Sequence, residues 1–173
     1  MPSSRPKTNE GARLIKIRPY EGQDVNTTRL IFDSAVTVTA SADYTLEQVE
    51  AWRARRPRTL SQWDQSMRSR DSYVALIGER VVGFSDLGDD GHIHMLFVDP
   101  RFARRGVGGA LLTFLEAQAK GRGLTRLSAN VSITARPLFE SRGFKVHREQ
   151  EVRVARQKLT NFRMTKKTAS PSY

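Results

Sequence analysis

The stretch FVDPRFARRGVGGALL, residues 97–112, runs from an apolar segment through Asp-Pro and three arginines to three glycines and a helix-like apolar repeat. Glycines between a strand and a helix let the backbone approach a ligand closely and adopt positive φ angles. The unpaired N–H groups at the start of the helix then point at an anion, and Arg104 and Arg105 add positive charge. The pattern therefore indicates a phosphate or pyrophosphate site, the alternative being a tight turn with close helix–strand packing.

Two familiar phosphate loops do not fit this pattern. A P-loop has Gly-Lys-Ser/Thr after its glycines, whereas Gly109 is followed here by Ala-Leu. A Rossmann fingerprint needs a parallel βαβ unit, but the strands expected before this loop are joined by tight turns and are therefore antiparallel. The third glycine of the Rossmann pattern would also be misplaced.

The hydropathy pattern around the loop predicts one α+β domain. Alternation of apolar and polar residues indicates strands, and apolar residues that recur at helical spacing indicate helices. The elements follow one another as strand, helices, three strands, helix, strand, helix and two strands. The expected strands are 14–20, 72–77, 80–87, 92–98, 125–131, 144–154 and 158–166, and the expected helices are 24–38, 45–56, 59–70, 107–119 and 135–142.

The composition fits a globular domain, with 173 residues of which 38% are hydrophobic and 27% charged. Because there is no cysteine, disulfides, a thiolate zinc site and a cysteine nucleophile are excluded. No apolar run approaches about 18 residues and the N-terminus lacks a secretory signal, so we expect no membrane span and a cytoplasmic location. We expect a disordered arm over residues 1–12, a single domain over 13–167 and a tail over 168–173.

The net charge of +11 and the pI near 10.7 favour anionic partners. Basic residues gather at 53–58, 101–105 and 153–167. These clusters are either solvated basic faces or parts of a site for nucleic acid or a phosphorylated cofactor. Nucleic acid is an alternative partner that the sequence does not favour.

The glycine-rich loop resembles the acetyl-CoA loop of the GCN5-related N-acetyltransferase (GNAT) superfamily. That loop has the pattern (Gln/Arg)-x-x-Gly-x-(Gly/Ala) after a strand that ends in (Tyr/Phe)-Val-x-Pro. Here Ala103 stands at the first position, so Arg104 or Arg105 has to replace that side-chain contact, while the backbone part of the loop is kept.

A second segment, SITARPLFESRGF at residues 132–144, resembles the helix after the family's fifth strand. Ala135, Phe139, Gly143 and Phe144 stand at the matching positions. The stretches ADYTLEQVEAW and KLTNFRM resemble a bacterial branch of uncharacterised small-molecule acetyltransferases. The resemblance covers residues 14–167, and both motifs occur in the family's order and spacing.

The resemblance implies an α/β/α fold with a mixed, mostly antiparallel seven-stranded sheet, flanked by helices and splayed between its fourth and fifth strands. Acetyl-CoA, as co-substrate, would sit in the resulting V, with its pantetheine arm along the fourth strand. The pyrophosphate would lie on the glycine-rich loop. The implied cofactor-binding residues are Leu96, Phe97, Val98, Arg104, Arg105, Gly106, Val107, Gly108, Gly109 and Phe139.

The implied reaction is direct attack on the thioester by a primary amine of a small molecule or protein. An alkylamine with a pKa of about 10.4 must first lose a proton, which requires a base. His92 and His94 share one face of the expected strand 92–98, and three routes remain open: His94 as base, His92 as base, or water relayed through either. No third ligand accompanies the two histidines, so no metal site is predicted.

A general acid is harder to assign, because Phe139 stands where many family members have tyrosine and cannot donate a proton. Ser132 and Tyr44 replace it by position only. The resemblance assigns acceptor binding to the first two helices and the last hairpin, where Tyr44 and Trp52 are the candidates and Trp63 is a further aromatic. Three acidic residues in that region would attract a cationic acceptor: Asp43, Glu47 and Glu50.

Three functions fit these observations. The first is an acetyl-CoA-dependent N-acetyltransferase that works through a ternary complex. The second is an acetyltransferase for an amine carried by RNA or a ribonucleoprotein, which the basic charge favours. The third is a non-catalytic acyl-CoA- or nucleic-acid-binding module, which Phe139 and the missing acidic base favour. The resemblance further allows a homodimer.

Overall fold

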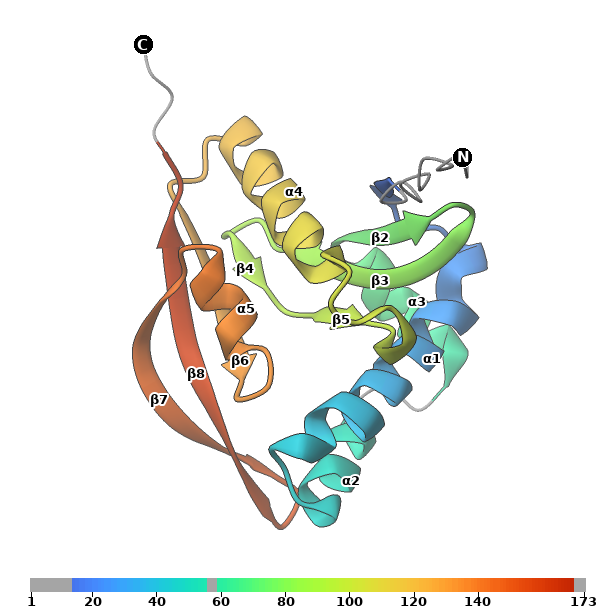
Figure 1. The fold of residues 1–173 in the computed structure, drawn as a ribbon, viewed down its shortest axis with the longest axis vertical. Coiled ribbons are helices and arrows are strands. Elements are labelled where there is room, and N and C mark those ends of the chain that lie inside the picture. The colour runs from blue at the N-terminus through green and yellow to red at the C-terminus, as the bar shows by residue number, and fades with distance from the viewer. Residues whose placement is uncertain (1–13, 56–58, 170–173) are drawn as a thin grey trace, which may run out of the picture.

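The computed structural model describes residues 14–55 and 59–169, and two sheets with helices packed around them form its framework (Figure 1). The first sheet is antiparallel with the order β1-β2-β3-β5, and the second has the order β4-β6-β8-β7. In the second sheet β4 pairs in parallel with β6, while β8 lies antiparallel between β6 and β7. The strands are β1 (Ile15–Pro19), β2 (Asp71–Ile77), β3 (Arg80–Leu87), β4 (His92–Ile93), β5 (Leu96–Val98), β6 (Arg126–Ser132), β7 (Lys145–Val154) and β8 (Gln157–Lys167).

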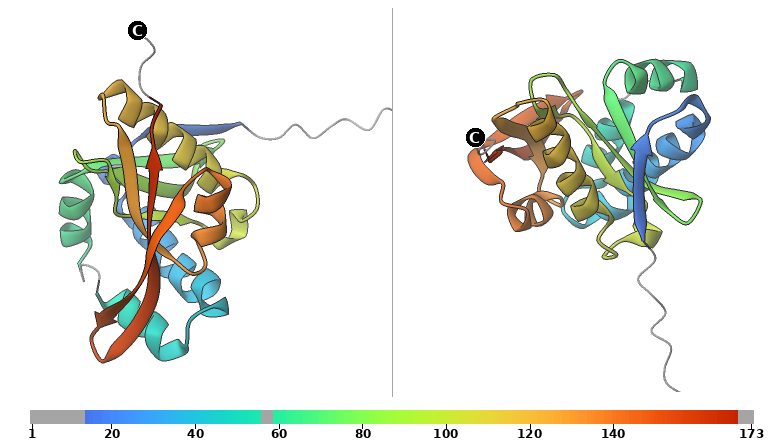
Figure 2. Two further views of the ribbon diagram at one scale, coloured as in Figure 1. Left: turned by 90° about the vertical axis from the view of Figure 1, so that its left-hand side faces the viewer. Right: turned by 90° about the horizontal axis from the view of Figure 1, so that it is seen from above.

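Helices cover both faces of the first sheet: α1 and α3 pack on one face and α4 on the other (Figure 2). The threonines that precede α2 and α3 form capping boxes, in which Thr45 accepts from the N–H of Gln48 and Thr59 from that of Gln62. The helix expected over 24–38 is a 3₁₀ turn, an α-helix and a π-helical turn in succession. The helical elements are η1 (Gly22–Asp24), α1 (Val25–Ser34), η2 (Ala35–Thr39), η3 (Ala40–Ala42), α2 (Leu46–Ala54), α3 (Leu60–Arg68), η4 (Pro100–Phe102), α4 (Val107–Gly121) and α5 (Arg136–Ser141).

Aromatic side chains fill the space between α1, α3 and the first sheet. Trp63 is buried between Phe32 and Phe84, with ring centroids 5.4 Å and 5.9 Å away. Its indole N–H donates to the hydroxyl of Thr28 at 3.0 Å, so the polar end of the ring is satisfied inside the core. Trp63 is therefore a core residue and not part of an acceptor pocket.

The strand expected over 92–98 is interrupted, and this part of the prediction is wrong. Oδ1 of Asp86 accepts hydrogen bonds from the backbone N–H groups of His94 (2.7 Å) and Met95 (3.2 Å). The hydroxyl of Ser85 donates to the carbonyl of Met95 at 2.6 Å. Because these backbone groups bond to side chains of β3, the segment divides into β4 and β5.

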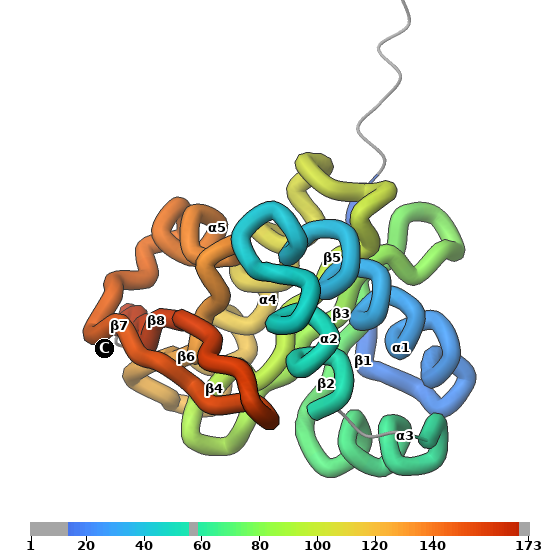
Figure 3. Tube along the Cα trace, turned by 90° about the horizontal axis from the view of Figure 1, so that it is seen from below, coloured from blue at the N-terminus to red at the C-terminus, as the bar shows by residue number. Residues whose placement is uncertain are grey.

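The interruption lets the two sheets diverge. β5 continues along β3, with Leu96 opposite Ser85, whereas β4 continues along β6, with Ile93 opposite Ala129. Figure 3 shows the result, with β4, β6, β7 and β8 on one side and β1, β2, β3 and β5 on the other. The predicted splay between the fourth and fifth strands is confirmed, with β4 and β5 together forming the fourth strand and β6 the fifth.

Asp86 is completely buried, and Arg70 forms a salt bridge with it, with 2.7 Å between Nε and Oδ2. Burial raises the pKa of this carboxyl group, but hydrogen bonding from His94 and the charge of Arg70 outweigh burial. The pKa of Asp86 is therefore lowered, and the group stays ionised in the folded protein.

Tyr44 connects the segment after η3 with the second sheet. Its hydroxyl donates to the carbonyl of Thr160 in β8 (2.6 Å) and accepts from the N–H of Ile133, just beyond β6 (3.0 Å). The side chain is buried, and burial raises the pKa of Tyr44. Both hydrogen bonds fix backbone at the place where β6 leaves the splay.

The chain ends agree only in part with the expected boundaries. Residues 1–12, expected to form an arm, lie outside the described residues. Thr168, placed by the sequence in the tail, is buried, and its N–H donates to the carbonyl of Thr125 at 3.0 Å. Among the helices that the structure describes, none has the length and apolar character needed to cross a membrane.

We expect Asp86→Asn to weaken the dependence of stability on acid. A carboxyl group whose folded pKa lies below its unfolded pKa stabilises the fold above the unfolded value, and this contribution is lost as pH falls through the folded pKa. The native protein should lose free energy of unfolding below about pH 5, and the variant should be less stable at neutral pH and lose less on acidification. Urea titrations across this range measure both. Asp71→Asn, which removes a half-exposed ion pair with Arg122, serves as the control, and equal acid slopes for Asp86→Asn and the native protein would contradict the assignment.

Tyr44→Phe should lower the free energy of unfolding by about 1–3 kcal/mol, because it removes the hydroxyl that bonds a half-buried carbonyl and a half-buried N–H. Tyr20→Phe is the matched control, since among the described residues that hydroxyl bonds the carboxylate of Asp64, at 2.8 Å, and no backbone group. Thermal and urea unfolding of both variants test the difference. A Tyr44 variant that loses no more stability than the Tyr20 variant would show that the connection contributes nothing.

Candidate functional site

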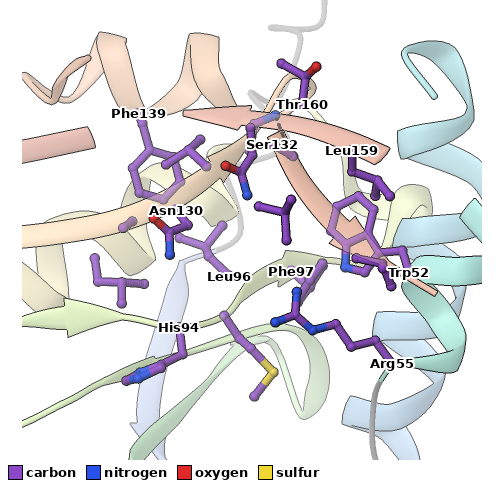
Figure 4. Close-up of a pocket in the computed structure, with 18 of the residues that line it drawn as sticks. Trp52, Arg55, His94, Leu96, Phe97, Asn130, Ser132, Phe139, Leu159 and Thr160 are labelled. Atoms are coloured by element: carbon purple, nitrogen blue, oxygen red, sulfur yellow. Dashed lines mark hydrogen bonds between the residues drawn. The ribbon is translucent and has the colours of Figure 1, made fainter. Parts of the chain in front are cut away.

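A cleft of about 330 Å³ lies in the splay between β5 and β6 (Figure 4). Leu96 and Phe97 of β5 line one side, and residues 129–132 of β6 line the other. Both strands present an edge to the cleft: β5 is the last strand of the first sheet, and β6 loses its pairing with β4 beyond Ala129. Such edges leave backbone N–H and C=O groups free to bond an extended ligand. Further lining residues are Trp52 and Arg55 at the end of α2, Phe139 of α5, and Leu159 and Thr160 of β8.

His94 lies at the break between β4 and β5 among the residues that line the cleft, with its side chain 42% exposed. Its Nδ1 is 3.7 Å from Oδ1 of Asp86, the same oxygen that accepts the backbone N–H of His94. A buried carboxylate beside Nδ1 orients the ring and favours the tautomer that carries its proton on that nitrogen. Nε2 is then left as a proton acceptor.

His92 is half-buried next to His94, with ring centroids 4.7 Å apart and planes nearly perpendicular. Its Nδ1 lies 2.9 Å from the hydroxyl of Ser128 and 3.4 Å from a guanidinium nitrogen of Arg163. Burial, the neighbouring His94 and the charge of Arg163 lower the pKa of His92. His92 is therefore held neutral, and its Nδ1 is already engaged by Ser128 and Arg163.

The glycine-rich loop has the geometry expected of an anion site. Gly106 adopts φ = +82°, and Arg104 is also left-handed at φ = +59°. The first intrahelical hydrogen bond of α4 runs from the N–H of Ala110 to the carbonyl of Gly106. The N–H groups of residues 107–109 consequently lack intrahelical acceptors at the positive end of the helix dipole. Arg105 is exposed beside them, stacked over the ring of Phe102 at 5.0 Å.

The loop glycines also allow close packing of α4 on α5. A Cβ at Gly108 would lie 2.6 Å from a methyl carbon of Leu138 in α5. The alternative explanation of the glycines is thus partly right as well, although the close neighbour is a helix and not a strand. Val107 is buried against Gly83 of β3, so a ligand could contact Val107 only through its backbone.

The structure brings half of the predicted site residues to one cleft, which is lined by His92, His94, Leu96, Phe97, Phe139, Tyr44 and Trp52. Val98, at the end of β5, and the loop residues 104–109, at the start of α4, are not among the lining residues. Asp43, Glu47 and Glu50 do not line the cleft, and Asp43 accepts a hydrogen bond from Thr134.

The two suggested substitutes for a tyrosine acid differ in availability. Tyr44 uses its hydroxyl for two backbone hydrogen bonds. Ser132 accepts from the N–H of Ala135 at 3.1 Å and has no acceptor for its own proton among the described residues. Ser132 is therefore the hydroxyl that faces the cleft with a proton to donate.

Three residues with functional character were missed in the sequence. Asp86 was detectable as an acid inside the apolar segment RVVGFSDL. Asn161 of β8 lines the cleft, and its Oδ1 is buried without a partner in the described part of the chain. Arg55 is one of several arginines in a row, and nothing in the sequence sets it apart. Over residues 14–55 and 59–169, no three His, Asp or Glu side chains gather to hold a metal ion.

The chain is similar to known proteins in sequence. Residues 40–167 match the family model described as the acetyltransferase (GNAT) domain. The uncharacterized N-acetyltransferase YafP of Escherichia coli (strain K12) is 37% identical over 150 residues, which cover 87% of this chain and 94% of YafP.

Solved structures of acetyltransferases are also similar to this chain. A GCN5-related N-acetyltransferase from Rhodopseudomonas palustris is 30% identical, with a TM-score of 0.83 over 88% of this chain and 94% of its own. The PaiA N-acetyltransferase of Thermoplasma acidophilum, solved with coenzyme A, shares the fold at 19% identity, with a TM-score of 0.71 over 89% of this chain and 99% of its own. The chain therefore belongs to the GCN5-related N-acetyltransferase (GNAT) family.

Proposed function

We propose that the protein transfers the acetyl group of acetyl-CoA to a primary amine by direct attack in a ternary complex. The observation that carries this proposal is the cleft itself, which lies between two free strand edges and has the partly exposed His94 among its lining residues. The coenzyme A bound to the PaiA structure supports the same ligand for this fold.

Acetyl-CoA fits the cleft and the loop together. The pyrophosphate binds the free N–H groups of Val107, Gly108 and Gly109, and Arg104 and Arg105 add charge at the loop. The pantetheine arm, which carries two amides, bonds the exposed edge of β5 at residues 96–98 as an additional strand would. Phe139 packs against the arm from α5.

His94 acts as the base in this proposal. Nε2 of His94 takes a proton from the attacking amine, while Asp86 holds Nδ1 and stabilises the imidazolium that forms. The amine nitrogen bonds to the thioester carbon, and the bond from that carbon to sulfur breaks. The proton that leaves the amine balances the one that the CoA thiolate gains, so transfer from His94 or from water completes the reaction.

The oxyanion needs a donor that is still free. The N–H groups of His94 and Met95 are bonded to Asp86, so neither is available. The thioester oxygen therefore accepts from another backbone amide on the edge of β5. Ser132, on the opposite wall, is the side chain placed to assist the departing sulfur.

Calorimetric titration should show micromolar binding of acetyl-CoA to the native protein. Gly106→Trp/Gly108→Trp should abolish it, because the indoles fill the loop. Since Trp at Gly108 collides with Leu138, Arg104→Glu/Arg105→Glu is needed as a milder variant, with an expected loss of about tenfold or more from two reversed charges. Unfolding curves establish that each variant is folded. No detectable binding by the native protein would disprove the proposed function.

His94→Ala should lower kcat by about 10²- to 10⁴-fold, the usual contribution of a general base. Acetyl-CoA binding should be unchanged. His147→Ala is the matched control, since His147 is exposed on β7 outside the cleft. A large loss in His92→Ala together with a small one in His94→Ala would transfer the role to His92.

A further inference from the structure

The described side chains that line the cleft include a positive charge but no negative one. Among the described residues, its lining includes no aspartate, glutamate or lysine, and Arg55 supplies the one guanidinium. The buried carboxylate of Asp86, beside His94, is already paired with Arg70 at 2.7 Å. A cationic acceptor, which the sequence suggested through Asp43, Glu47 and Glu50, would thus meet no negative charge in the cleft.

Arg55 is available to a ligand. It follows the last residue of α2, its side chain is exposed, and among the described residues no hydrogen bond or ion pair engages its guanidinium. Its neighbour Arg53, by contrast, pairs with Asp33 at 3.6 Å. Figure 4 shows the guanidinium of Arg55 extending from α2 towards Phe97 on the wall of the cleft.

The position of Arg55 separates it from the proposed cofactor site. The glycine-rich loop starts α4 and packs against α5. Arg55 follows α2 and shares its end of the cleft with Trp52 and Leu159 (Figures 3 and 4). In the proposed function, the glycine-rich loop binds the phosphates of acetyl-CoA. The charge of Arg55 is therefore left for the other substrate.

We infer that the acceptor is a small amine that also carries a carboxylate, which Arg55 binds. This inference rests on the proposed function. A guanidinium matches a planar carboxylate through two parallel hydrogen bonds, and its single positive charge balances the single negative charge of that group. The apolar neighbours Trp52, Val152 and Leu159 fit an apolar or aromatic body between the two polar ends of the acceptor.

Matched amines test the inference. The free amino acids phenylalanine, leucine and methionine are each compared with the corresponding amide and with the amine that lacks the carboxyl group. The native protein should prefer the carboxylate form in kcat/KM by about tenfold to a hundredfold, the effect of one charge-assisted hydrogen-bonded pair. The preference should arise in the KM of the amine.

Arg55→Glu should reverse this order, so that the amide is used better than the amino acid. The KM of acetyl-CoA should not change. Arg126→Glu, which places the same charge change on an exposed residue of β6 outside the cleft, should keep the native order. An unchanged order in Arg55→Glu, or an increased KM of acetyl-CoA with every acceptor, would overturn the inference.

A second measurement does not depend on turnover. N-acetylphenylalanine, N-acetylleucine and N-acetylmethionine, which are the products of the same reaction, are titrated into CoA-saturated native protein and both variants. Saturable binding that Arg55→Glu weakens at least about tenfold supports the inference. No binding by the native protein overturns it even if other amines are acetylated, whereas failure of the proposed function is recognised separately by the absence of acetyl-CoA binding.

Discussion

The buried carboxylate of Asp86 is the contact on which the rest of this structure depends. By accepting the N–H groups of His94 and Met95, it takes two consecutive residues out of strand pairing. The backbone on one side of this point pairs with β6 and on the other side with β3, so the two sheets must diverge. The cleft is the space left by that divergence, and everything proposed for acetyl-CoA depends on it.

One oxygen of Asp86 serves both the fold and the proposed chemistry. The oxygen that accepts the backbone N–H of His94 at the break between β4 and β5 also faces Nδ1 of His94. Placing an ionised group in the core is costly unless it is paired, and Arg70 together with the two backbone donors offsets that cost. The position and the tautomer of the imidazole are therefore set by a contact that the fold needs in any case. If His94 is the base, a change at Asp86 affects both stability and the proposed chemistry.

The fold could be predicted well from local signals in the sequence, and the details of the site less well. The glycine-rich loop could be predicted from the sequence because Gly106 needs a positive φ at the start of an apolar helix. The break within 92–98 could not be predicted, since the residues there alternate like an unbroken strand and the carboxylate that breaks it comes from β3. Tyr44 lines the cleft, and its hydroxyl partners come from distant segments that no local pattern indicates. Arg55 differs from Arg53 in the surroundings of its side chain, because Arg53 pairs with Asp33 and Arg55 lines the cleft.

The order of the second sheet affects how the protein is made. β8, the last strand along the described chain, lies in the middle of that sheet, between β6 and β7, and supplies Thr160 to Tyr44 and Asn161 to the cleft. Before β8 is present, β6 has only the two-residue pairing with β4 to hold it. During synthesis the ribosome must therefore release nearly the whole domain before the cleft can form. Until then, the edge of β6 that pairs with β8 remains open, and an unpaired strand edge can pair with other chains and aggregate.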